Sequence, residues 1–295
     1  MNPETPWHAG RLDRAHGPQK LLFGQMYEDA GIEREAFQSL RRIFCIASAG
    51  DTAMLLSQEH QVVACDINPV QLAYARRRAY GGPRETGDAD KGMRLLRSLA
   101  PLAGWHKEVL QTFAALSDPG QQVNYWRTHL DTRRFRAGFD AIMSRPILRV
   151  MYSPDFLSLL PPKFGSIMRK RLVRGIERHP NASNPYIRAL LLGAEISSPE
   201  AVAANIEFVL GDAASILEAS PPASFSGFTL SNILDGVSEA YGKRLVRAVR
   251  RSATLEALVI LRSFAEPSVP ASTNHAARDR SMLWGVVDIR SLDSL

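Results

Sequence analysis

Two short apolar runs separated by one short helical segment constrain the fold of this chain more than any other feature. Residues 41–47 and 61–66 form the two runs, and residues 52–59 carry the helical pattern between them. After the second run, Asn68 can cap a helix and Pro69 can occupy its first position. Near-continuous apolar runs of this length are typical of strands buried in a parallel sheet. The sequence therefore predicts a strand–helix–strand–helix unit.

The same alternation resumes only after a long helical stretch. Residues 72–205 show amphipathic helical patterns broken by glycine and proline turns, with almost no strand alternation. A helix is then expected over 239–252, and further strands are expected at 206–210, 225–233, 256–264 and 282–289. We therefore predict an α/β protein with a doubly wound, Rossmann-like sheet and a large helical insertion between the second and third strands.

Composition sets outer limits on what the chain can be. Of its 295 residues, 45% are hydrophobic and 22% are charged, which is typical of a globular protein. No run of about 18 apolar residues occurs, so we expect no membrane span. Met1 is not followed by a basic segment and then an apolar one, so we expect no signal peptide. We therefore expect a cytoplasmic location. Cys45 and Cys65 are expected to be inert core residues, and the seven histidines show no metal-ligand spacing.

Small or polar residues follow each predicted strand. In an open parallel sheet a ligand binds beyond the carboxyl ends of the strands, so these residues are the candidate binding site. In chain order they are Ser48, Ala49, Gly50 and Asp51; Asp66 and Ile67; Asp212 and Ala213; Ser231, Asn232 and Asp235; and Arg262.

Two details of this set favour a particular ligand. Asp66 ends the second strand, where a carboxylate can accept hydrogen bonds from both hydroxyls of a ribose. The first turn keeps only Gly50 and lacks the G-x-G-x-x-G spacing that admits a diphosphate. The sequence therefore predicts a nucleoside without a diphosphate. S-adenosylmethionine is the commonest such cofactor for this arrangement, and we expect Asp212 to lie near its adenine amino group.

Several segments, taken together, resemble a known family. They are 23–29 (FGQMYED), 46–53 (IASAGDTA), 66–71 (DINPVQ), 184–186 (NPY) with 191–193 (LLG), and 278–281 (RDRS). In this order they are similar to the S-adenosylmethionine:diacylglycerol 3-amino-3-carboxypropyltransferases of betaine-lipid synthesis, and the chain looks like a shortened relative. The match covers most of the chain, and 46–53 with 66–71 is its specific part. The family has Tyr and Trp where this chain has Phe23 and Tyr27.

The resemblance implies a class I methyltransferase-like sheet and a defined chemistry. Such enzymes transfer the four-carbon amino acid part of the cofactor and release methylthioadenosine. The expected parts are an amino-terminal arm and helix (1–40), a core that binds S-adenosylmethionine (41–71 with 206–295), and an insertion that forms the acceptor lobe (72–205). The acceptor is a small molecule or a lipid such as diacylglycerol.

Displacement at the γ-carbon of the methionyl chain depends mainly on how that chain is held. We expect Arg262 to pair with its carboxylate, and Tyr27 or Tyr186 to lie against its sulfonium or ammonium group. An alcohol acceptor also needs a base, for which Asp235 and Glu28 are the candidates.

Other functions remain open at this point. The cofactor's own amine can attack the γ-carbon and give azetidine-2-carboxylate, in which case Asn184, Tyr186 or Ser231 would suffice to accept the amine's proton. Ordinary methyl transfer is a second alternative. A third is a non-catalytic module that holds a nucleoside and contacts a membrane or RNA.

The insertion also carries a candidate membrane contact. Apolar residues at 151–157 and Phe164 stand beside the basic run from Arg169 to Arg178. Such a combination favours peripheral contact with an anionic membrane, on its inner face. We expect no nucleic acid partner, and the oligomeric state stays open.

Overall fold

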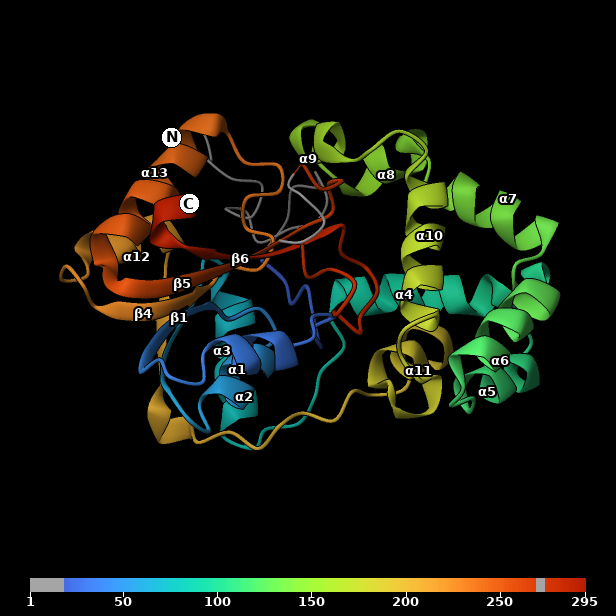
Figure 1. The fold of residues 1–295 in the computed structure, drawn as a ribbon, viewed down its shortest axis with the longest axis horizontal. Helices are drawn as coiled ribbons and strands as arrows, with labels where there is room; N and C mark the ends of the chain where they lie inside the picture. Colours follow the sequence, from blue (N-terminus) through green and yellow to red (C-terminus); the bar gives the residue numbers. More distant parts are fainter. Residues whose placement is uncertain (1–18, 269–273) are drawn as a thin grey trace.

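The computed structural model describes residues 19–268 and 274–295. In these residues six strands form one sheet, in the order β3-β2-β1-β4-β5-β6 (Figure 1). The strands are β1 (Arg42–Ile46), β2 (Gln61–Asp66), β3 (Ile206–Leu210), β4 (Phe225–Thr229), β5 (Ala253–Ser263) and β6 (Val286–Ser291). The first five run parallel, and β6 runs antiparallel to β5. Strand order reverses between β1 and β4, as in a doubly wound sheet, so the predicted fold class is confirmed.

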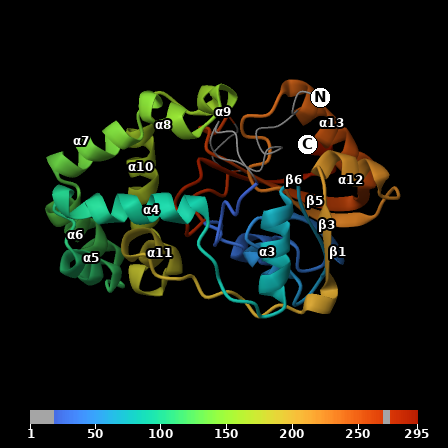
Figure 2. The ribbon, with the colours of Figure 1, turned by 180° about the vertical axis from the view of Figure 1, so that it is seen from behind.

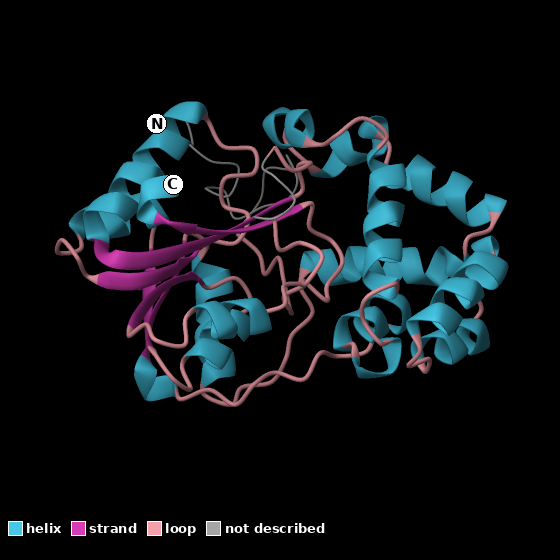
Figure 3. Ribbon diagram, viewed as in Figure 1, coloured by secondary structure: helices cyan, strands magenta, loops and turns pink. Residues whose placement is uncertain are grey.

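Helices cover both faces of this sheet (Figure 3). One face carries α1 (Gly31–Ala36), α2 (Asp51–Leu56) and α3 (Pro69–Ala79), and the other carries α12 (Ala213–Ala219) and α13 (Glu239–Ser252). Ile43 and Cys45 of β1 pack in the core on the α1–α3 side, whereas Phe44 packs with α12 and α13. Because successive strand side chains point to opposite faces, a strand covered on both sides must be apolar at every position. This explains the unbroken apolar runs in the sequence.

The insertion between β2 and β3 forms a helical lobe beside the sheet (Figures 1 and 2). Its helices are α4 (Asp88–Leu99), α5 (Lys107–Ala114), α6 (Pro119–Tyr125), α7 (Arg133–Ile142), α8 (Arg145–Met151), α9 (Pro154–Leu159), α10 (Phe164–Ile176) and α11 (Pro185–Leu192). The lobe has its own apolar core, in which Phe113, Trp126 and Phe135 are buried. Residues 193–202, without helix or strand, lead back toward β3.

The ends of some elements differ from those predicted. The boundary expected at residue 72 falls inside α3, because Leu72, Ala75 and Ala79 pack in the sheet core and tie this helix to the sheet. The lobe therefore begins after α3. The fourth strand stops at Thr229 and not at residue 233, because the chain turns at Ser231, which has a left-handed φ of 51°.

Two arginines of the basic run in α10 join the lobe to the sheet. Arg171 donates to the carbonyls of Phe264, Ala265 and Leu283 and pairs with Glu266. Arg174 donates to the carbonyls of Ala276 and Trp284. Burial lowers the pKa of both guanidinium groups. Two residues of the run from Arg169 to Arg178 are therefore an internal tether, and contact of the insertion with a membrane stays a prediction. Within the described ranges, no helix is long and apolar enough to cross a bilayer.

Candidate active site

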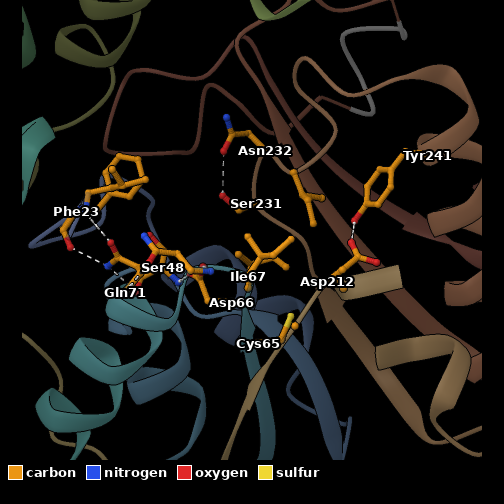
Figure 4. A pocket seen from close by; sticks show the side chains of 16 residues that line it. Phe23, Ser48, Cys65, Asp66, Ile67, Gln71, Asp212, Ser231, Asn232 and Tyr241 are labelled. Carbon is orange, nitrogen blue, oxygen red and sulfur yellow. Dashed lines mark hydrogen bonds between the residues drawn. The ribbon is translucent and has the colours of Figure 1, made fainter. Parts of the chain in front are cut away.

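A pocket opens at the carboxyl ends of β1, β2, β3 and β4 (Figure 4). Part of the set predicted from the strand ends lines it, namely Ser48, Asp66, Ile67, Asp212, Ala213, Ser231 and Asn232. Cys65 also lines it, so one of the two cysteines expected in the core borders the pocket; both are free thiols whose pKa is raised by burial. The topology therefore gathers polar groups from four strand ends at one place.

Asp66 lies at the centre of this wall. Its Oδ2 accepts a hydrogen bond from the Ser48 N–H at 3.1 Å, and its Oδ1 accepts one from the Asn68 N–H at 2.9 Å. Burial raises the pKa of the carboxyl group to about 6, against the opposing effect of these hydrogen bonds. Each carboxylate oxygen can accept a second hydrogen bond. Asp66 is thus fixed in place and keeps capacity for hydroxyl groups of a ligand.

The rest of the first turn supports the pocket from behind. Gly50 has a φ of 93°, which favours glycine, and directly precedes α2. Asp51 accepts the Met26 N–H at 2.9 Å and pairs with Arg78 at 2.8 Å, and Arg78 also donates to the carbonyl of Ala49. The three residues Ala49, Gly50 and Asp51, predicted to contact a cofactor, do not line the pocket. They instead hold the turn that carries Ser48.

Gln71 is a pocket residue whose role the sequence analysis did not identify. Its Oε1 accepts the N–H groups of Leu22 and Phe23 at 3.0 and 3.1 Å, and its Nε2 donates to the carbonyls of Phe23 and Ser48, both at 2.9 Å. Three of these bonds fasten residues 22 and 23 along the pocket rim, where Phe23 is a lining residue (Figure 4), and the fourth ties them to Ser48 after β1. The segment DINPVQ contained this glutamine, but spacing alone does not reveal partners some 48 residues away.

Asp212 and Tyr241 form the opposite side of the pocket (Figure 4). Asp212 caps α12 by accepting the Ser215 N–H at 2.9 Å, and the Tyr241 hydroxyl donates to its other oxygen. Burial and this carboxylate raise the pKa of the Tyr241 hydroxyl. Asp212 lines the pocket, and its contact with an adenine amino group stays a prediction. Tyr241 was missed, because only the packing of α13 against α12 brings it there.

A cluster of buried charges lies behind the pocket. The Arg262 guanidinium donates to Glu33 and, at 3.3 Å, to Asp279, and lies 3.7 Å from Glu28 Oε2. All four side chains are buried, and Arg262 does not line the pocket. The expectation that Arg262 pairs with a cofactor carboxylate is therefore corrected, because carboxylates of the protein already surround its charge.

Glu28 connects this cluster to the pocket. Ser231, whose backbone turn places it on the pocket wall, donates its hydroxyl to Glu28 Oε1. The second oxygen, Oε2, is buried and accepts no hydrogen bond from the described residues. Burial raises the pKa of Glu28 to about 7, although Arg262 and Ser231 act in the opposite direction. A group that titrates near neutrality thus lies one hydroxyl away from the pocket.

The predicted aromatic and amide residues have structural partners instead. The Tyr186 hydroxyl donates to the Glu28 carbonyl at 2.6 Å, and Asn184 caps α11 and donates to the Arg280 carbonyl. The Tyr27 hydroxyl accepts a hydrogen bond from Gln25. None of these three predicted residues lines the pocket, so the structure does not bring them together with the strand-end residues.

Asp235, the other candidate base, is also occupied. Its oxygens accept hydrogen bonds from the Ser263 hydroxyl at 2.6 Å, the Phe264 N–H at 3.0 Å and the Asn232 amide at 3.4 Å. Burial raises the pKa of this carboxyl group. Asp235 does not line the pocket, and these bonds fix the loop that carries Ser231 and Asn232. Of the two candidate bases, Glu28 is better placed.

Comparison with known proteins adds little beyond the fold. No known protein family matches the sequence, and no curated protein matches it. Two solved structures with distant similarity are a protein of Nostoc punctiforme PCC 73102, provisionally named an O-methyltransferase (11% identity, TM-score 0.34), and the rRNA methyltransferase AviRa of Streptomyces viridochromogenes (13% identity, TM-score 0.30). The matches cover 88% and 82% of this chain, and 43% and 76% of the other chains. This chain thus spans less than half the length of the first.

Proposed function

We propose that this chain is a transferase that uses S-adenosylmethionine and moves its 3-amino-3-carboxypropyl group to an acceptor, releasing methylthioadenosine. The observation that carries the proposal is the Glu28–Ser231 pair, a buried carboxyl group with a raised pKa that reaches the strand-end pocket through a hydroxyl. Methyl transfer would leave S-adenosylhomocysteine and is the alternative outcome of the test below.

The pocket suits the nucleoside part of this cofactor. Asp66 offers free acceptor capacity to the ribose hydroxyls, and Asp212 lies across the pocket for the adenine amino group. Phe23, Ile67 and Ile233 supply apolar surface for a base. The turn after β1 has no glycine-rich diphosphate loop, which agrees with a nucleoside bearing a sulfonium chain.

The Glu28–Ser231 pair gives the acceptor proton a destination. As an acceptor hydroxyl attacks the γ-carbon, a C–O bond forms, the C–S bond breaks and its electron pair stays on sulfur as a neutral thioether. The hydroxyl proton passes to Ser231 Oγ while the proton of Ser231 passes to Glu28. General base catalysis of this kind contributes about 10²–10⁴-fold to a rate.

Cyclisation of the cofactor to azetidine-2-carboxylate is a second candidate, and one observation favours it. Among the described residues, the strand-end pocket and the large cavity of the helical lobe share no lining residue. In that part of the chain the pocket therefore does not continue into the lobe, which favours a reaction that needs no second substrate there. The same Ser231 hydroxyl can take the proton of the cofactor's ammonium group, which must be neutral to attack its own γ-carbon.

Mass spectrometry of the products distinguishes these reactions. We expect methylthioadenosine when the protein is incubated with S-adenosylmethionine. If it forms with azetidine-2-carboxylate from the cofactor alone, cyclisation is the reaction. If it requires diacylglycerol or a cell extract, transfer is the reaction. Formation of S-adenosylhomocysteine alone would overturn the proposal.

The role of the pair has a separate test in the pH profile. Because the Glu28 carboxyl group must be ionised to accept a proton and its pKa is about 7, the rate should rise as pH passes from 6 to 8. Ser231→Ala should lower the rate by about 10²-fold and abolish this rise. Asn232→Ala, a change at the neighbouring pocket residue, should keep the rise. An unchanged profile in Ser231→Ala would exclude the relay.

A further inference from the structure

A second large cavity lies in the helical lobe and not at the strand ends. Its volume is about 710 Å³, and α7, α8, α10 and the turn before α10 form its walls. Leu148, Leu160 and Phe164 contribute apolar surface, and Arg145, Lys163 and Arg169 contribute positive charge. We call it the lobe cavity. The proposed function assigns it no role.

The positive charge of this cavity is only partly compensated. Arg169 pairs with Asp140 at 2.8 Å, and its Nε is buried without a hydrogen-bond partner. Arg145 and Lys163 are exposed, and in the described part of the chain neither is paired with a carboxylate. Asp140 is the one acidic residue among those that line the cavity. Two cations are thus free to bind an anion from solution.

The start of α10 adds to this positive field. No side chain caps the helix, and its first residues, Phe164, Gly165 and Ser166, line the cavity. The preceding Lys163 has a left-handed φ of 56°, which is uncommon for a residue other than glycine. The amino end of a helix carries a partial positive charge, which supplements the side-chain cations.

A smaller cavity of about 340 Å³ adjoins the lobe cavity through the shared residue Arg145. Arg149 and Leu157 line it, and between the two arginines Ile147 is 50% exposed. Helices α8 and α9, which carry these residues, lie at the top of the lobe in Figure 1, and Phe156 of α9 packs against Phe264, which follows β5. Cationic and apolar side chains thus alternate along one surface that leads into the lobe cavity.

We propose that the lobe cavity binds an anionic amphiphile, that is, a phosphate ester joined to a hydrocarbon chain. The phosphate pairs with Arg145 and Lys163. The chain lies against Leu148, Leu160 and Phe164. A neutral lipid would leave the cations unused, and a free phosphate would not contact the apolar residues that line the cavity. The same chemistry has two sources, a phospholipid in a bilayer or a soluble short-chain ester. This inference does not depend on the proposed function.

Calorimetry with dihexanoyl phosphatidate below its micelle concentration tests the proposal directly. We expect saturable binding to the full chain. Arg145→Ala should weaken it about tenfold, the effect of losing one charge-assisted contact. Lys163→Gly should do the same without loss of fold, because glycine suits a left-handed φ. Arg134→Ala, on the exposed part of α7 and outside the cavity, is the matched control and should leave affinity unchanged.

Two further probes identify the source of the ligand. Sedimentation with vesicles of phosphatidylcholine, with and without phosphatidylglycerol, shows whether the site is used at a bilayer; salt-sensitive binding that Arg145→Ala weakens assigns it to a membrane lipid. Binding of dihexanoyl phosphatidate without such sedimentation assigns it to a soluble ester. An affinity for inorganic phosphate equal to that for dihexanoyl phosphatidate would overturn the proposal of an amphiphile. Vesicle binding that is unchanged in Arg145→Ala and Lys163→Gly would also overturn it.

Discussion

The strand-end pocket and the charge cluster behind it both bury carboxylates, but they stabilise them in different ways. Asp66 accepts hydrogen bonds from two backbone N–H groups, which strand and helix geometry fix in place. Glu33 and Asp279 instead surround the guanidinium of Arg262, with Glu28 beside it. A carboxylate held by backbone can be removed without leaving a charge unpaired. In the cluster, the loss of one partner leaves others buried and uncompensated.

The largest expected effect is at Asp66, where a substitution should weaken cofactor binding but not folding. Asp66→Ala should weaken the binding of S-adenosylmethionine by about 3–6 kcal/mol, the sum of two charge-assisted hydrogen bonds, while the protein stays folded. Calorimetric titration measures the affinity, and Asp155→Ala, at an exposed site in the lobe, is the control. If the affinity stays the same, Asp66 does not belong to the cofactor site.

The opposite result is expected for Arg262. Arg262→Ala should lower the free energy of unfolding by about 3–5 kcal/mol, because it leaves the surrounding carboxylates buried without a counter-charge. Chemical denaturation measures the loss. Arg278→Ala, which removes an exposed pair with Glu35, should cost only about 0–1 kcal/mol. Equal losses for the two variants would show that the cluster is no more coupled than a surface ion pair.

Glu28 should make stability depend on pH. Its pKa is about 7 in the folded protein and 4.5 as a free side chain, so the folded state binds its proton more tightly than the unfolded state. This group therefore lowers stability as pH rises from 4.5 to 7, by about 3 kcal/mol. Glu28→Gln should remove that part of the decline. Urea denaturation at pH 5 and pH 7.5 gives the free energy of unfolding of each protein at both pH values. An equal change in this free energy for wild type and Glu28→Gln would contradict the raised pKa.

The smallest expected effect concerns Tyr186. Tyr186→Phe removes the hydroxyl that donates to the Glu28 carbonyl and should cost about 1 kcal/mol of stability. Tyr80→Phe, at a side chain that is 65% exposed, should cost almost nothing. Thermal unfolding compares the two. A Tyr186→Phe variant as stable as wild type, but inactive, would return this hydroxyl to the list of candidate catalytic groups.

The sequence predicted the parts of the site that depend on topology. Asp66, Asp212 and Asn232 line the pocket because each follows a parallel strand, and parallel strands present their carboxyl ends at one edge. It did not predict which side chains turn away from that edge. Arg262 lies near the end of β5 and Asp235 in the loop after β4, yet both are directed into buried networks with residues far along the chain.

The sequence by itself determined the doubly wound sheet, the helical insertion and the strand ends that form the pocket, because local apolar patterns and strand order fix these features. Only the tertiary structure decided the partners of the buried charges, the bonds of Gln71 that hold the rim, and the separation of the pocket from the lobe cavity. These depend on contacts between residues far apart along the chain, such as Arg262 with Asp29, which are 233 positions apart. A local sequence pattern does not predict such pairings, because the direction of each side chain depends on the distant groups that pair with its charge and form its hydrogen bonds.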